Sequence, residues 1–390
     1  MKKRVKLKRK TVSLIVKNLI VLVALAAVAL AAVFSWFTDH PEVDSSGVSA
    51  TVEVNQSLEY FIVSPEFTAA EHTDNDQSIN VYQAVNKLLE ENAEWNADPN
   101  NSGETPKIAQ WRTGEVSLDP DLNPELGFLS DLALSDITSD GKTFKIPKLI
   151  QHQHITYVDT DAAFSDATPN KEYLSFDIYF RCPQSCTVVM KNNSTISPVG
   201  TPSSASEQGI KNAAVGAVRL SAVDARDITK FIWIPAPSVW YDGREDPGTL
   251  YTSEDLRDLG TNAGGNVTSD GHTISLTSET TKDHAYYSQT STTQNDTTVY
   301  TTTRNVMDSS AANSIVRPSV EVDNSPTYQL PDNESLVTLL PNGMNDGYNY
   351  GRIRINLWIE GEDAEARLAL VDGQFNINLV FDAIATASEP

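Results

Sequence analysis

The sequence predicts an all-β fold: an antiparallel β-sandwich of the jelly-roll type, with one short helix and a polar insertion, preceded by a single N-terminal transmembrane or signal helix. Apolar and polar residues alternate along several segments, which indicates strands with one buried and one solvated face. Helical periodicity is convincing in one place only. Strands therefore do not alternate with helices, and this excludes a doubly wound fold.

The first 37 residues join a basic leader to an apolar run. Residues 1–17 hold eight Lys or Arg and no acid, and residues 18–37 are almost wholly apolar. At ~1.5 Å per residue this run is just long enough to cross the hydrocarbon core of a membrane. The positive charges keep the leader in the cytoplasm, so the chain from about Phe37 onward is predicted to be exported. Its length favours a retained anchor, while cleavage between Ser35 and Trp36 stays open.

The rest of the chain is strongly acidic. Eight of the 29 basic residues lie in the leader, so residues 18–390 carry 21 basic against 52 acidic residues, a net charge of −31. A surface with this charge is repelled by phosphate backbones and by anionic lipid, which argues against nucleic-acid binding.

Strand patterns dominate beyond a tether or donor-strand segment at residues 38–48, and residues 49–390 form the predicted extracellular sandwich. In the stretch 352–360, Ile355 is expected in the core and Arg354 on a solvated face, so Ile355→Ala should destabilise the fold and Arg354→Ala should be near neutral. The expected strands cover residues 50–54, 58–63, 173–181, 213–223, 228–234, 352–360 and 375–382.

Two other segments differ from this pattern. Val81, Val85, Leu88 and Leu89 share one face of a helix. Residues at about 241–330 are rich in Ser and Thr and read as an exposed insertion, either a β-hairpin or a small subdomain, with weak strands near 272–276 and 297–304. Disorder is the alternative that this composition leaves open.

No motif for catalysis or for a cofactor occurs in the chain. The His-Glu-x-x-His, Gly-x-Ser-x-Gly, P-loop and dinucleotide patterns are all missing. His152 and His154 are the only close histidine pair, and no third zinc ligand accompanies them, so a pair of surface histidines is the better interpretation. We therefore predict a non-enzymatic protein with no catalytic residues, no metal site and no cofactor.

Two residue types leave alternatives open. Cys182 and Cys186 flank a three-residue turn, a spacing that permits a small disulfide, or two free thiols in a reducing environment. Trp233, Trp240 and Trp358 lie on or beside predicted strands, where a sugar-binding platform is conceivable but packing is the commoner role.

Several short stretches together have a familiar order. An apolar run ends in Phe-Ser-Trp-Phe-Thr-Asp, and a Gly-Val pair then opens the first strand; further motifs occur at residues 173–180, 216–219, 231–235 and 358–363. In these motifs the chain resembles the TasA/camelysin-like family of exported proteins of Gram-positive bacteria, which form or support cell-surface and biofilm-matrix fibres. It is most similar to uncharacterised membrane-anchored relatives. The longer basic leader and the polar insertion depart from the family pattern.

The resemblance implies a jelly-roll sandwich that assembles when an N-terminal strand is donated to the next subunit. The predicted function is then a cell-surface structural protein, a fibre or biofilm-matrix subunit, located at the cell membrane facing outward or released after cleavage. Its expected partners are the membrane, through residues 18–37, and further copies or other surface proteins. The candidate assembly segment holds Trp36, Phe37, Val48 and Val52.

Two alternatives remain. One is a surface metalloprotease of the camelysin type, although the chain has no zinc-protease motif. The other is a membrane-anchored module that binds carbohydrate or protein.

Overall fold

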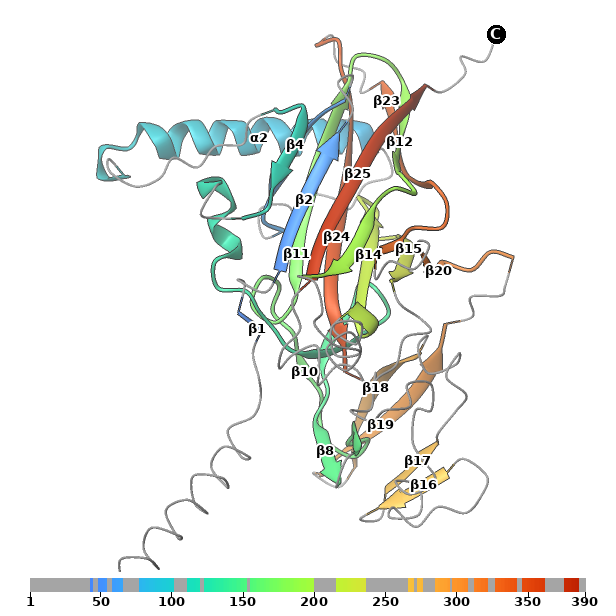
Figure 1. Ribbon diagram of the computed structural model, residues 1–390. Helices are drawn as coiled ribbons and strands as arrows, with labels where there is room; N and C mark the ends of the chain where they lie inside the picture. The colour runs from blue at the N-terminus through green and yellow to red at the C-terminus, as the bar shows by residue number, and fades with distance from the viewer. Residues whose placement is uncertain are drawn as a thin grey trace, which may run out of the picture. The chain divides into compact units, whose positions relative to one another are not determined.

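The body of the chain is built mostly of β-strands, which form several sheets together with one long helix (Figure 1). The fold is taken from a computed structural model. It describes residues 43–44, 48–54, 58–65, 77–101, 111–119, 123–152, 155–199, 215–235, 266–269, 272–275, 285–294, 297–307, 312–321, 327–341, 346–361 and 375–385.

One group of strands is centred on two long neighbours, β11 (Leu174–Cys182) and β24 (Asn349–Glu360), which pair antiparallel along the whole of β11. Further strands extend the group on both sides. In spatial order it runs β3 (Glu59–Val63), β11, β24, β14 (Val218–Asp224), β15 (Thr229–Ile234) and β20 (Val316–Pro318).

A second group is centred on β25 (Phe375–Ala385), the last strand of the chain. On one side β25 pairs with β2 (Val48–Val54), which in turn pairs with β4 (Gly114–Ser117). On the other side, successive strands pair with the two halves of β25, and shorter strands follow. These are β12 (Cys186–Met190), β13 (Thr195–Pro198), β23 (Glu334–Pro341), β22 (Tyr328–Gln329) and β21 (Val320–Glu321).

The two groups are joined where β23 pairs with β24, so that the hydrogen-bonded network closes on itself. Most pairings are antiparallel. Three are parallel in the described part: β2 with β25, β15 with β20, and β24 with β6 (Asp136–Ser139). Shorter elements complete it: β1 (Val43–Asp44), β5 (Ala133–Leu134), β7 (Phe144–Ile146), β8 (Leu149–His152), β9 (Ile155–Val158), β10 (Ser165–Asp166), and the 3-10 turns Pro99–Asn101 and Pro124–Leu129.

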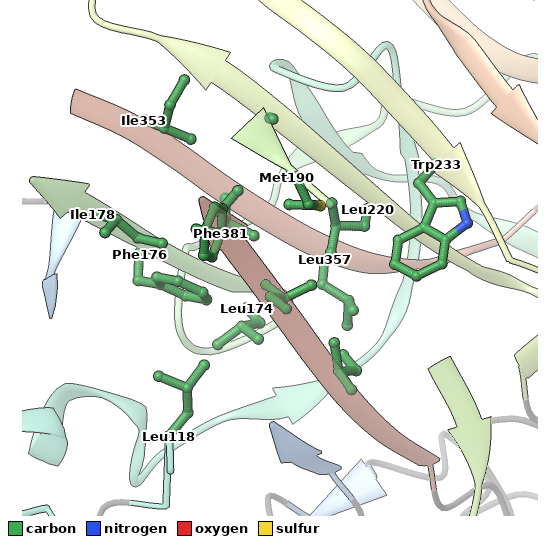
Figure 2. Packing of buried hydrophobic residues seen from close by; sticks show 14 of the residues in the cluster. Leu118, Leu174, Phe176, Ile178, Met190, Leu220, Trp233, Ile353, Leu357 and Phe381 are labelled. Carbon is green, nitrogen blue, oxygen red and sulfur yellow. The ribbon is translucent and has the colours of Figure 1, made fainter. Parts of the chain in front are cut away.

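A single large hydrophobic core lies between the two groups. Alternate residues of each long strand point into it, because successive side chains of a strand face opposite ways. Figure 2 shows Phe176 of β11, Leu357 of β24 and Phe381 of β25 among the side chains that meet there. Ile355 is buried in the same core, as the alternation predicted.

The helix α2 (Gln77–Ala97) packs on the opposite face of the first strand group, near Tyr179 of β11 and Tyr350 of β24. Its predicted apolar side is confirmed, since Val81, Val85 and Leu88 are buried against aromatic residues of β3, β11 and β24. With 21 residues the helix is longer than expected. Arg352, Asn356 and Glu360 on the polar face of β24 are buried, and Arg354, which was expected to face water, is only partly exposed and contacts buried Asp177.

The Ser/Thr-rich stretch contains two hairpins, β16 (Asn266–Ser269) with β17 (His272–Ser275), and β18 (Ala285–Gln294) with β19 (Thr297–Val306). Its last part is not separate from the body, because β20, β21 and β22 pair with body strands or with each other. The predicted segment 18–37 lies outside the described residues. Within those residues, no helix has the length and apolar character needed to cross a membrane.

Candidate functional site

Part of the predicted assembly segment forms a strand inside the second strand group. Val48 pairs with Phe375, and Val52 pairs with Leu379 on one side and Val116 on the other. β2 therefore runs between β25 and the four-residue β4, parallel to the first and antiparallel to the second. In Figure 1 the blue β2 lies beside the red β25. Ser35, Trp36 and Phe37 lie outside the described residues.

The strand next to β2 contributes directly to the hydrophobic core. Phe375, Ile377, Leu379 and Phe381 of β25 are all almost completely buried. If β2 were absent, the main-chain groups of β25 on that side would lose their partners. An open strand edge of this kind is a template for another strand. The position of β2 is thus a slot that must be filled by a strand.

The connection between β2 and the body is short. β2 ends at Val54 and β3 begins at Glu59, yet β3 pairs with β11 in the other strand group. The chain must therefore cross from one group to the other within a few residues. Upstream of β2, Val43 and Asp44 pair with Leu134 and Ala133 of the same chain, so part of the predicted tether lies against the body.

A network of charges links β11 and β24 on the face that does not line the large core. Asp177 is fully buried and accepts hydrogen bonds from Arg352 Nη1 at 2.8 Å and from Arg354 Nε at 2.8 Å. Burial alone would lower the pKa of Arg354, but the charge and hydrogen bond of Asp177, together with the nearby Tyr173 and Asp227, outweigh it, so the pKa rises. Next to this network, Asn356 Oδ1 accepts a bond from Ser175 Oγ at 2.7 Å, and its Nδ2 donates to Ser221 Oγ at 3.2 Å.

An aromatic cluster surrounds one cation near the end of β11. The guanidinium of Arg181 lies 4.3 Å from the ring centre of Trp111 and 4.2 Å from that of Tyr348, and it pairs with Glu59. Such stacking fixes the side chain between two rings. Sequence reasoning missed this cluster, because its members lie far apart in the chain and share no spacing. Its contacts are internal, which favours a structural role.

The two cysteines are free thiols, both buried. Burial, and after it a hydrogen bond to Cys182, raise the pKa of Cys186 to about 12. A thiol with so high a pKa forms almost no thiolate at neutral pH, so it is a poor nucleophile there. The side chains are within hydrogen-bonding reach, and an oxidised pair remains a prediction.

The other candidate residues lie partly outside the described part of the chain. His152 lies in β8, and His154 lies outside the described residues. In the described ranges no group of three or more His, Cys, Asp or Glu could hold a metal ion. Trp233 and Trp358 are both fully buried, with their indole N–H groups bonded to Ser319 and Glu360, so neither can serve as a sugar platform.

Comparisons with known proteins add no identification, since no protein-family model, curated protein or solved structure matches this chain.

Proposed function

We propose that this chain is a non-enzymatic structural protein of the cell surface whose copies assemble into fibres by exchanging the N-terminal strand β2. The observation that carries the proposal is the slot beside β25: β2 fills it, but only a few residues join β2 to a strand of the other group. The proposal includes membership in the TasA/camelysin-like family and a jelly-roll sandwich as the fold. Two strand groups facing across one core support the sandwich.

Exchange is favoured by the short hinge. Domain swapping, in which identical chains trade one element, occurs at little cost because the exchanged strand makes the same contacts in the new place. Short and strained hinge loops promote it, since the extended connection relieves the crossing between the two groups. The β2 strand of a second copy fits the slot because it has the same sequence as the strand that it replaces.

Exchange in one direction leads to an open chain of subunits. Each copy would give its β2 to the next and receive one from the previous copy, which is a head-to-tail contact without closure. Main-chain hydrogen bonds of strand addition would supply much of the affinity. Residues 18–37 would hold a subunit at the membrane until cleavage, or permanently.

A hinge insertion tests this proposal. A short Gly-Ser insertion after Asn55 gives β2 enough slack to fill its own slot, so we expect electron microscopy of residues 36–390 to show far fewer fibres than the parent chain. The matched control carries the same insertion between Pro341 and Asp346, in the β23–β24 connection, and should form fibres like the parent.

Two results would contradict the proposal. Fibres that survive the hinge insertion would exclude exchange of β2. A parent protein that stays monomeric would favour the anchored binding module, and stoichiometric zinc together with cleavage of a protein substrate would favour the metalloprotease.

A further inference from the structure

The hairpin β18–β19 has a regular, uninterrupted geometry. Its ten residue pairs run from Ala285 opposite Val306 to Gln294 opposite Thr297 with no shift in register. At ~3.4 Å per residue each strand is about 34 Å long. The two strands form a sheet of their own in the described part, so each of them has one edge without a neighbouring strand. Strand edges of this length are uncommon unless another chain uses them.

The hairpin is attached to the body near its open end and along β18. The N–H of Tyr287 donates to Thr138 Oγ1 of β6 at 2.7 Å, so this N–H points away from β19. Gln289 Nε2 donates to the carbonyl of Ala162 at 2.8 Å. On β19, the side chain of Thr302 donates to the carbonyl of Thr160 at 2.6 Å. The body therefore contacts a main-chain N–H at the outer edge of β18. Its bond to β19, by contrast, involves only a side chain of that strand.

The remaining surface of the hairpin gives little stabilisation by itself. One face presents exposed hydroxyl groups, with Thr290 opposite Thr301 and Ser288 opposite Thr303, and Val299 on the same face is 44% exposed. A two-stranded hairpin without an apolar face is marginally stable in water, and a third strand is usually needed. The hairpin would thus gain stability from a further strand on β19.

The charge of the hairpin favours one partner. Its two strands contain no acidic residue and a single charged residue, Arg304, although the whole chain has a formal net charge of −23. Two copies of so acidic a protein repel one another over most of their surfaces. At β19 they can approach without acidic groups facing each other. This strand also lacks the proline, lysine or bulge with which natural edge strands block pairing.

We infer that the outer edge of β19 is a self-association surface that takes β19 of a second copy as its antiparallel partner. The result is a four-stranded sheet across a two-fold axis, in which the same residues of both copies meet. This inference does not depend on exchange of β2. Exchange would join subunits end to end, whereas pairing through β19 joins two subunits, or two fibres, side by side.

The test places acidic groups on β19. In the full chain, solubilised in mild detergent, we expect Thr301→Asp combined with Thr303→Asp to raise the dissociation constant of the dimer about tenfold or more, because like charges then face each other across the new strand pair. The matched control, Thr290→Asp combined with Thr292→Asp, puts the same charge on the same face of β18, one strand farther from the partner, and should have a clearly smaller effect. Sedimentation velocity measures both.

Hydrogen exchange and the hinge insertion complete the experiment. The main-chain amides of β19 should be protected in the dimer and should lose protection in the Thr301→Asp, Thr303→Asp variant. Dimers should persist in the hinge-insertion variant, which removes β2 exchange. This result would separate pairing through β19 from the proposed exchange of β2. Equal effects of the two Asp pairs would overturn the inference, as would a wild-type chain that is monomeric. A monomer with protected β19 amides would assign the edge to another segment of the same chain.

Discussion

The strands β24 and β25 have the same alternating sequence pattern, yet their polar faces have different surroundings. On β24, Arg352, Asn356 and Glu360 are buried between the sheet and the elements that cover it. On β25, Asn376 is exposed and Asp382 is partly exposed. A polar residue at every second position thus does not by itself mean a face toward water. The difference lies in the hydrogen-bonding partners. On β24 the charged and amide side chains pair with groups of β11 and β14, and these pairings allow the polar side chains to be buried.

The largest effect is expected from removing the central charge on the covered face. Asp177→Ala should cost about 3–5 kcal/mol of unfolding free energy, because two arginines are left without their buried partner. On β25, Asp382→Ala should cost about 0–1 kcal/mol, since its 3.7 Å ion pair with Lys191 is partly solvated. Urea unfolding with an unchanged m-value measures both. Equal costs would mean that the face of β24 is open to water.

The inward faces should respond alike. Ile355→Ala on β24 and Ile377→Ala on β25 each empty a site in the same core, and each should cost about 2–5 kcal/mol. The same unfolding measurement applies. A near-neutral result at either position would show that the strand is turned the other way round.

A smaller difference is expected for the amides. Asn356→Ala removes the link between Ser175 and Ser221 and should cost about 1–3 kcal/mol, because the buried Ser175 hydroxyl loses its acceptor and Ser221 loses one of its two partners. The exposed Asn376 of β25 is the matched control, and its replacement by Ala should stay within ~0.5 kcal/mol. If the two substitutions cost the same, the hydrogen-bonded chain on β24 contributes nothing to stability.

The smallest effect appears only at high pH. Burial raises the pKa of Tyr173, which packs beside the covered face, from 10.0 to about 12. The unfolded chain releases this proton first, so the contribution of Tyr173 is complete below pH 10 and is lost as the pH rises from 10 to about 12. Tyr173→Phe should therefore lose less stability over that interval than the parent chain. Parallel curves for the two proteins would contradict the assignment to Tyr173.

Local patterns were enough to predict the long strands and the helix. The inward set on β24 and the apolar side of α2 follow from spacing alone, because period 2 and period 3.6 are properties of the backbone. The covering of the polar face could not be predicted, since Asp177 meets Arg352 and Arg354 from a distant part of the chain. The pairing of β2 beside β25 was missed for the same reason. β19 was expected as a weak strand, whereas β18 alternates too little to be recognised.

The neighbourhood of β2 and β25 also sets the timing of folding. These strands lie near opposite ends of the chain, and Val48 pairs with Phe375. A polypeptide is made from its N-terminus, so β2 cannot pair with β25 until residues 375–385 have been synthesised. Contacts between distant segments form slowly. The pairing of β2 with β25 is consequently a late step in the folding of the chain.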